Sequence, residues 1–349
     1  MKKILILISF AAILNCGSNN LSLENTDPND ITGEIAASFA NTITSSDLKD
    51  YLYIIASDEF EGRNTGEPGQ KKAVKYLKDF YVSQKIKSPL GGDEYYQEVP
   101  AEFLNKNSRR GELKASENVL AFIKGTEKPE EIIIISAHLD HEGIKDGQVY
   151  NGADDDGSGT VALLEIAEAF NMAKKAGSGP KRSILFLHVT GEEKGLLGSR
   201  HYTDNDPVFP LANTVADLNI DMIGRIDPKR KEGDRNYVYL IGSDKLSSDL
   251  HNLSESVNNT YANIELDYTY NDENDRNRYY YRSDHYNFPK NNVPVIFYFN
   301  GTHDDYHKPS DTPDKIEYDL LENRTRLVFH TAWEIANRDE RIVLDKATE

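Results

Sequence analysis

Long apolar runs without polar alternation limit what this chain can fold into. Three of them are IIIISAHLD, SILFLHVTGEE and VPVIFYFNG, at residues 132–140, 183–193 and 293–301. A strand with one solvated face alternates polar and apolar residues, so a continuous run indicates a strand that is buried on both faces. Two further strands are predicted at 215–224 and 236–243.

Amphipathic helices are predicted around these strands. One starts at Ser46, and the others occupy residues 70–84, 160–177, 247–261 and 319–338. Buried strands that are separated by helices form a mostly parallel sheet with helices on both faces. The predicted fold class is therefore α/β, with a mostly parallel mixed central sheet.

The charge of the chain indicates which classes of partner it can bind. The 349 residues carry a formal net charge of -18. Nucleic-acid binding needs a basic surface, so we expect no nucleic-acid partner. The hydrophobic content of 38% is enough for one large α/β domain.

The N-terminal segment has the pattern of an export signal. Lys2 and Lys3 precede an apolar run at residues 4–14, which is too short to span a bilayer comfortably. Cys16, the only cysteine, follows as in bacterial lipoproteins, although Asn15 stands where that pattern prefers a small residue. We expect a protein that is exported and held to the bacterial cell envelope only by a lipid at Cys16, or a secreted protein if the signal is simply cleaved.

The signal is predicted to cover residues 1–16 and to be followed by two regions. Residues 17–45 are rich in Asn, Ser, Thr and Asp without periodicity, which predicts a flexible tether. Residues 46–340 are predicted to form one folded domain. A single cysteine rules out an intramolecular disulfide framework.

Polar side chains gather where the predicted strands end. The ends of four strands supply His138 and Asp140, Glu192 and Glu193, Asp221, and the group His303, Asp304, Asp305 and His307. Ligands of open α/β sheets bind outside the carboxyl ends of the strands. We expect these side chains to share one rim with the acidic turn NGADDDGSGT at residues 151–160.

Several carboxylates on one rim either raise their pKa values or bind divalent cations. His and carboxylate ligands suit zinc, and less selectively manganese or cobalt. Taken singly, each feature has an ordinary explanation: a hydrogen-bonded histidine, a solvated glutamate pair, or an acidic turn. Their joint occurrence at consecutive strand ends favours a metal site, and there are enough candidate ligands for two ions.

The motifs SAHLDHEG, NGADDDGSGT, VTGEEKGLLGS, LNIDMIG and YHKPSDT resemble, in this order, those of the co-catalytic zinc exopeptidases. That group includes secreted bacterial leucyl aminopeptidases and the glutamate carboxypeptidases. The resemblance covers about residues 46–335 and implies the zinc exopeptidase (phosphorylase/hydrolase-like) fold, with the metal site at the carboxyl ends of the strands. It also implies that residues 46–340 are a catalytic domain. Only about thirty residues (88–118) lie where the family often carries a protease-associated insert, so we expect none.

The resemblance implies two zinc ions. Asp155 would bridge them, His138 and Asp221 would complete one site, and Glu193 and His307 would complete the other. Manganese or cobalt in place of zinc stays open. The flanking Asp154 and Asp156 would be supports rather than ligands, and the peptide bond between Asp155 and Asp156 would be cis.

The resemblance also implies catalytic roles. Glu192 would be the general base, and Asp140 would orient the imidazole of His138. Tyr306 looks like the tyrosine that stabilises the oxyanion in the carboxypeptidase branch, although a tyrosine packed in the core is an equal alternative.

The substrate pocket is predicted in RNRYYYRSDHYNF, residues 276–288. Tyr281, Tyr286 and Phe288 could line an apolar side-chain pocket, which favours an aminopeptidase. Arg282 or Arg278 could instead bind a substrate carboxylate, which favours a carboxypeptidase. Equally, these tyrosines could be core residues and the arginines solvated. We also place Asp284 in this pocket, and expect that Asp284 and His285 could support the metal ligands.

An aminopeptidase acting on peptide substrates is the first expectation. A carboxypeptidase, a glutaminyl-cyclase-like acyltransferase and a non-catalytic metal-binding or receptor-like protein are the alternatives. The sequence leaves the oligomeric state and the preferred residue open.

Overall fold

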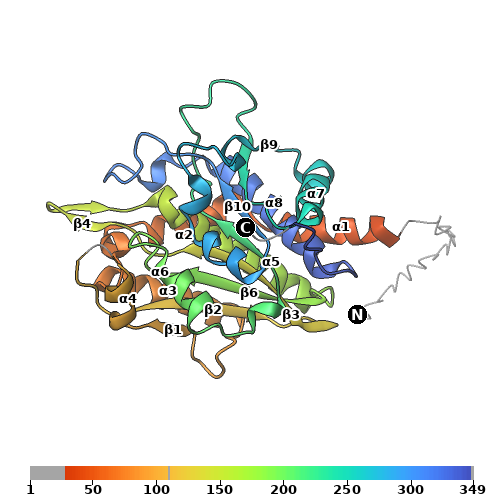
Figure 1. Ribbon diagram of the computed structural model, residues 1–349, viewed down its shortest axis with the longest axis horizontal. Helices are drawn as coiled ribbons and strands as arrows, with labels where there is room; N and C mark the ends of the chain where they lie inside the picture. Colours follow the sequence, from red (N-terminus) through yellow and green to blue (C-terminus); the bar gives the residue numbers. More distant parts are fainter. Residues whose placement is uncertain (1–27, 109–110, 347–349) are drawn as a thin grey trace, which may run out of the picture.

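The structure of the protein, a computed structural model, describes residues 28–108 and 111–346. Within them, eight strands form one sheet in the order β1-β2-β6-β3-β7-β10-β8-β9 (Figure 1). They are β1 (Tyr96–Val99), β2 (Ser116–Ile123), β3 (Lys128–His138), β6 (Arg182–Val189), β7 (Thr214–Ile220), β8 (Tyr237–Ile241), β9 (Glu265–Asp267) and β10 (Val295–Phe299). A separate hairpin is formed by β4 (Gly143–Lys145) and β5 (Gln148–Tyr150).

The centre of this sheet is parallel. β6, β3, β7 and β10 pair in parallel, whereas β2 and β8 flank them in antiparallel orientation. The carboxyl ends of the four central strands therefore meet at one edge, where α/β sheets bind ligands. This topology confirms the predicted mostly parallel mixed sheet.

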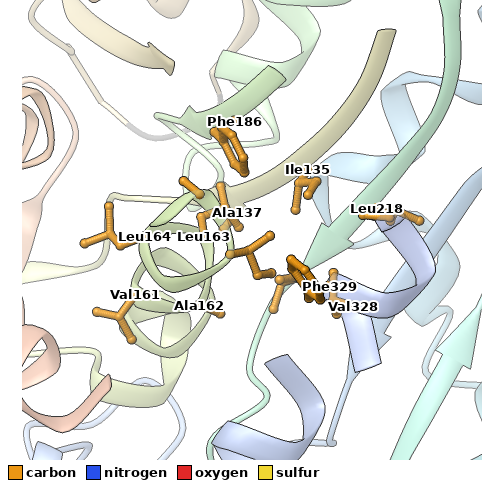
Figure 2. Packing of buried hydrophobic residues seen from close by; sticks show 14 of the residues in the cluster. Ile135, Ala137, Val161, Ala162, Leu163, Leu164, Phe186, Leu218, Val328 and Phe329 are labelled. Atoms are coloured by element: carbon orange, nitrogen blue, oxygen red, sulfur yellow. The ribbon is translucent and has the colours of Figure 1, made fainter. Parts of the chain in front are cut away.

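The apolar run of β3 shows why alternation is missing from the sequence. Ile133, Ile135 and Ala137 face one layer of the core, and the intervening Ile132 and Ile134 face another. Successive side chains of a strand point to opposite faces, so a strand buried on both faces needs apolar residues at every position. Figure 2 shows the first layer, in which side chains of β3, β6 and β7 meet those of two helices, residues 159–175 and 318–337.

Helices cover both faces of the sheet. The larger core layer contains side chains of α1 (Pro28–Ala40), α2 (Ser45–Ile55), α3 (Pro68–Gln84), α5 (Gly159–Lys175), α7 (Ser248–Val257) and α8 (Tyr318–Asn337). The other face is covered by α6 (Leu197–Asp204) and residues 288–295. A short helix, α4 (Ala101–Asn107), packs beside α6. The five helices predicted from periodicity are confirmed.

The predicted tether is wrong for its second half. Residues 28–40 form α1, which contacts α5 and α8. Ala36 and Ala40, four positions apart, are fully buried, and so is Ile43 in the following turn. Ile35 and Phe39 pack against the same core, and the Phe39 ring stacks on Trp333. Residues 35, 36, 39 and 40 share one helix face, but this apolar pattern spans only two turns and follows a polar segment.

The predicted signal and lipid site lie outside the described residues, as do residues 17–27 of the predicted tether. Among the helices of residues 28–108 and 111–346, none combines the length and apolarity that crossing a membrane requires. Membrane attachment through Cys16 stays a prediction.

Candidate functional site

The polar residues predicted at the strand ends do meet at the carboxyl edge of the sheet. His138 is the last residue of β3, Asp221 follows β7 directly, and Glu193 lies four residues beyond β6. The loop after β10 brings His307 to the same place, and the turn before α5 brings Asp155. All five residues predicted to hold metal are thus brought together.

The first cluster comprises His138, Asp155 and Asp221. The Nε2 atom of His138 lies 3.2 Å from Oδ1 of Asp155 and 3.6 Å from Oδ1 of Asp221. All three side chains are buried, and their donor atoms lie within 4.8 Å of one another. Three convergent nitrogen and oxygen donors of this kind fit one zinc-type cation.

The second cluster comprises Asp155, Glu193 and His307. The Nε2 atom of His307 lies 3.0 Å from Oδ2 of Asp155 and 3.2 Å from Oε1 of Glu193. Asp155 therefore presents Oδ1 to the first cluster and Oδ2 to the second. One carboxylate that offers one oxygen to each side is the arrangement needed to bridge two ions.

His141 is a residue of the site that sequence reasoning missed. It is fully buried, and its Nδ1 atom lies 2.9 Å from Oε1 of Glu193 and 3.8 Å from Oδ2 of Asp155. The available signal was its position in HLDHEG, three residues after His138, in a segment that leaves a strand at the rim.

Several donor atoms of these clusters have no hydrogen-bond partner within the described chain. They include Nε2 of His138, Nδ1 of His141, Oδ2 of Asp155 and Oε1 of Glu193, all buried. Buried polar atoms are normally satisfied, so atoms that are close together but not aligned for hydrogen bonds indicate a missing ligand between them. A cation at each cluster would satisfy them.

The charges of the second cluster are balanced between imidazoles and carboxylates. Burial and the Glu193 carboxylate act to raise the pKa of Asp155, but the imidazoles of His141, His138 and His307 hold that pKa below its usual range. Burial acts to lower the pKa of His307, whereas Asp155 and Glu193 raise it to about 10. Protons on imidazoles thus occupy a place that a cation can take, with proton release on binding.

Asp140 orients His138, although through its main chain. The Nδ1 atom of His138 donates to the carbonyl oxygen of Asp140 at 3.0 Å, while the carboxylate is 3.9 Å away. That carboxylate accepts hydrogen bonds from Thr65 Oγ1 at 2.6 Å and from the backbone N–H of Glu192 at 3.1 Å. The imidazole therefore keeps Nε2 free to face the first cluster, and the backbone of Glu192 is fixed.

The acidic turn is held by its two outer aspartates. Asp156 accepts hydrogen bonds from the backbone N–H groups of Met222, Gly159 and His138. Asp154 accepts one from Gly224. The peptide bond between Asp155 and Asp156 is cis, as the resemblance implied. Only the middle aspartate of the three points at both clusters.

Two further residues fix the turn and were not predicted to do so. The Asp311 carboxylate accepts hydrogen bonds from the backbone N–H groups of Asp154 at 3.0 Å and Asp155 at 3.2 Å. His303, which the sequence placed on the rim, lies with its Nε2 atom 3.2 Å from Oδ2 of Asp154. His303 therefore contacts the turn through Asp154 and belongs to neither cluster.

Glu192 faces a narrow cavity beside the first cluster. The cavity has a volume of about 30 Å³ and is lined by Asp155, Glu192, Asp221, Met222, Tyr279, Arg282, Phe297, Phe299, Thr302 and Tyr306. Burial raises the pKa of the Glu192 carboxyl well above its usual range, and the Glu193 carboxylate raises it further. A carboxyl group with a raised pKa is suited to accept and return a proton near neutral pH.

Tyr306 lies in the same cavity as Glu192. Its ring stacks on His307 with centroids 3.9 Å apart, and its hydroxyl oxygen lies 3.4 Å from Nη2 of Arg282. Burial raises the pKa of the Tyr306 hydroxyl, and the carboxylates of Asp155 and Glu192 raise it further. The hydroxyl therefore stays protonated and can donate a hydrogen bond into the cavity.

The residues of the predicted substrate pocket lie in three different places: the narrow cavity, a larger hollow and the buried core. Arg282 lines the narrow cavity. Tyr281 and Tyr286 are exposed and line a larger hollow of about 570 Å³. Both tyrosines are therefore accessible to a bound molecule, but they border a different cavity from Glu192.

Two residues of the predicted pocket are wrong. Phe288 is fully buried in the core layer that includes Tyr202, where no substrate can contact it. Asp284 is also fully buried and accepts a hydrogen bond from the Ser199 hydroxyl. Instead, the neighbouring Ser283 supports a cluster residue, since its hydroxyl donates to Oδ2 of Asp221 at 2.7 Å.

Comparison with known families identifies this arrangement. The model of Peptidase family M28 matches residues 118–332. The chain belongs to this family. The relatives that match this chain include proteins with both names that the sequence left open, aminopeptidase and carboxypeptidase.

Two curated members share about a third of their aligned residues with this chain. A probable glutamate carboxypeptidase of Arthroderma benhamiae is 37% identical over 105 residues, which are 30% of this chain and 14% of that protein. Leupeptin-inactivating enzyme 1 of Streptomyces exfoliatus is 31% identical over 180 residues, which are 52% of this chain and 34% of that protein. The matches thus span well under half the length of these relatives.

The fold is shared over nearly the whole chain with a solved M28-type structure. BSAP, a zinc aminopeptidase from Bacillus subtilis, superimposes with a TM-score of 0.64 at 16% identity, covering 88% of this chain and 98% of that one. This likeness confirms the zinc-exopeptidase type of fold for residues that include both clusters.

Proposed function

We propose that this chain is a metal-dependent exopeptidase, and specifically an aminopeptidase that releases N-terminal residues from peptides. The observation that carries the proposal is the position of Asp155 between two clusters of donor atoms, beside Glu192 in a narrow cavity. His138, Asp155 and Asp221 would hold one zinc ion, and Asp155, Glu193 and His307 a second. Manganese or cobalt could replace zinc.

Each residue then has a defined task. When bound, two divalent cations polarise the scissile carbonyl and lower the pKa of water. Glu192 accepts a proton from the attacking water and returns it to the leaving amine. The Tyr306 hydroxyl donates a hydrogen bond to the oxygen on which negative charge develops. Asp140 keeps His138 and Glu192 in place through the hydrogen bonds described above.

The similarity of fold to a zinc aminopeptidase, over most of both chains, supports action at the amino end of a peptide. The three carboxylates that line the cavity, from Asp155, Glu192 and Asp221, already have roles in metal binding and proton transfer, so the choice of the amino end rests on the fold.

A carboxypeptidase is the second candidate because of Arg282. Its guanidinium lies beside the Tyr306 hydroxyl in the cavity, where it could bind the carboxylate of a C-terminal residue. The curated relative named as a probable glutamate carboxypeptidase supports this alternative.

Three matched peptides distinguish these candidates. The zinc-loaded protein should cleave a peptide with free ends and its C-terminally amidated form, but not its N-acetylated form. A chelator should abolish cleavage and added zinc restore it. The opposite pattern, with the amidated peptide resistant, would identify a carboxypeptidase. Ring closure of an N-terminal glutamine, detected by mass as loss of ammonia, would identify a cyclase. No reaction despite bound zinc would favour a binding protein.

We further propose that the chain is exported and lipid-anchored through Cys16, on the pattern of residues 2–16. Expression of the full chain with a labelled fatty acid tests this, since Cys16→Ser should lose the label and leave the membrane fraction. An unlabelled wild-type chain in the soluble fraction would show a simply cleaved signal.

A further inference from the structure

The second cluster has one imidazole more than the resemblance implies. His141 follows Asp140 at the end of β3, and its buried ring points Nδ1 at Glu193 and Asp155. Neither ring nitrogen of His141 has a hydrogen-bond partner within the described chain. A fully buried imidazole without a hydrogen bond is costly unless something else occupies its lone pair.

Four donor-to-donor distances around this cluster are close to those of a zinc site, and the donor atoms of His141, Asp155 and Glu193 all lie within 4.8 Å of one another. Oε1 of Glu193 lies 2.9 Å from Nδ1 of His141 and 3.2 Å from Nε2 of His307. Oδ2 of Asp155 lies 3.8 Å from the first nitrogen and 3.0 Å from the second. A tetrahedral zinc ion with bonds of about 2.0–2.1 Å has its donor atoms about 3.3 Å apart.

The ring of His141 is also fixed in position. A side chain at Gly152 would place its first carbon 2.5 Å from Cγ of the imidazole, closer than any real contact. Gly152 has a φ of +54°, a left-handed conformation that glycine adopts without strain. The backbone of the acidic turn therefore packs directly on the imidazole and holds Nδ1 toward the cluster.

We propose that His141 is a fourth protein ligand of the second zinc-type cation, an inference that rests on the proposed metal-dependent function. The second cation then has ligands His141, Asp155, Glu193 and His307. The first has only His138, Asp155 and Asp221. Four protein ligands are typical of ions that are held permanently, and three leave a position open for water or substrate.

The two ions should therefore differ in affinity. The second cation is retained, and the first exchanges more readily, so activity responds to the occupancy of the first cluster. The Nδ1–H group of His138 donates a hydrogen bond to the carbonyl oxygen of Asp140. Neither ring nitrogen of His141 has such an acceptor in the described chain. The tautomer of His141 is thus set by the cation itself, which requires Nδ1 unprotonated.

Metal retention tests this inference without any peptide. The zinc-loaded protein, His141→Ala and His141→Gln are dialysed against graded chelator concentrations, and bound zinc is counted at each step. The wild type should lose its two equivalents in two separate steps. Both variants should lose the later, tighter equivalent at a chelator concentration lower by at least about tenfold, in the range seen for damaged metal sites. Gln keeps most of the side-chain volume in case Ala disturbs folding.

Two matched variants give the scale of the effect. His307→Ala removes an accepted member of the second cluster and should weaken the same step. His188→Gln removes another buried imidazole, which bonds only to Tyr81, and should leave both steps unchanged. Loading with cobalt adds a direct readout, because the visible bands of Co²⁺ depend on its coordination number and donor set, so loss of the His141 nitrogen should change their position and intensity.

The outcomes separate this inference from the proposed function. Unchanged steps and an unchanged cobalt spectrum in both His141 variants would overturn the inference, and so would a wild type that binds fewer than two ions. If the wild type binds two ions in two steps and the His141 variants lose the tighter ion early, but no peptide is cleaved, the peptidase function is rejected and the ligand role of His141 is supported.

Discussion

Two buried polar regions lie side by side in this protein, and they differ in whether their polar atoms form hydrogen bonds within the chain. Arg63, fully buried, donates to the carbonyl oxygens of Ile55, Leu139, Asn151 and Gly152 at 2.7–3.0 Å. The two clusters of His and carboxylate side chains next to it contain at least four buried donor atoms without hydrogen bonds in the described chain. We call the Arg63 region closed, because its hydrogen bonds are made within the chain, and the cluster region open, because several of its donor atoms have no such bond.

The clusters differ from the rest of the core because several donor atoms without hydrogen bonds converge on one place, whereas other such atoms in the described chain, Nδ1 of His188 among them, belong to no such group. A buried group that only stabilises the fold finds its partners within the chain, as the guanidinium of Arg63 does. A group that binds a ligand keeps its lone pair unused until that ligand arrives. The two regions are also linked, because Leu139 and Gly152 belong to the segments that carry His138 and Asp155. The closed region fixes the backbone on which the open region is built.

The largest expected effect lies in the open region. Glu192→Gln removes the proposed proton acceptor but leaves both clusters intact. We expect kcat to fall by about 10²- to 10⁴-fold, because that is the usual contribution of a general base. Zinc content and the melting temperature should not change. A variant with normal turnover would exclude Glu192 as the base, and a variant that loses zinc would make it a metal ligand.

The closed region should show the reverse pattern. Arg63→Met leaves up to three buried backbone carbonyls without donors, since that of Gly152 also accepts the N–H of Gly157, and each costs about 1–3 kcal/mol. We expect the free energy of unfolding to fall by about 3–5 kcal/mol, measured by chemical denaturation of the metal-free protein. Loss of metal affinity should follow from this, because the two ligand-bearing segments lose their common anchor.

An exposed arginine provides the control for Arg63. Arg341 also donates to two backbone carbonyls, those of Ala212 and Thr214, but from the surface. Water can replace it there, so Arg341→Met should cost under about 1 kcal/mol. Equal losses in the two variants would show that the contacts of Arg63 are not special and would remove the distinction between closed and open regions.

A carboxylate between the two regions should give an intermediate effect. Asp311 is closed, since it accepts the N–H groups of Asp154 and Asp155, yet it acts on the bridging residue. Asp311→Asn keeps the shape but weakens both bonds, because the acceptor loses its charge. We expect zinc affinity to fall by about 10- to 100-fold in chelator competition. Asp304→Asn, the same change at an exposed neighbour, should have no effect.

The sequence was sufficient for the parts of this site that lie at regular positions. Strand ends are found from apolar runs, so the meeting of His138, Glu193 and Asp221 could be expected from parallel topology. The role of Asp311 could not, because its partners are backbone N–H groups of a turn far away in the chain. Contacts to the backbone carry no residue-type signal in the partner.

The errors have physical causes of the same kind. Phe288 was assigned to a substrate pocket because it follows tyrosines and precedes a strand, but aromatic type alone does not tell which face of a loop is buried. The prediction missed α1 because its apolar pattern, from Ile35 to Ala40, is only two turns long and follows a polar segment. His141 was overlooked beside the stronger HLD pattern, although it carries the same chemistry.

A third buried polar group, which belongs to neither region, extends the comparison to the pH dependence of stability. Glu165 on α5 is closed, since Oε2 accepts the N–H of Thr44 at 3.1 Å, but burial raises its pKa from 4.5 to about 8. A carboxyl group with a higher pKa in the folded state stabilises the fold while protonated, and this stability is lost as the pH rises from about 4.5 to 8. Glu165→Gln, which is neutral at every pH, should therefore match the wild type at pH 4.5 and exceed its free energy of unfolding at pH 8, by on the order of 1 kcal/mol. Glu168→Gln, one turn along the helix and less buried, should show no such gain. If the Glu165 variant is less stable than the wild type at pH 8, the charged carboxylate is well solvated by its bonds, and a closed hydrogen bond is then enough to hold a buried charge without a cation.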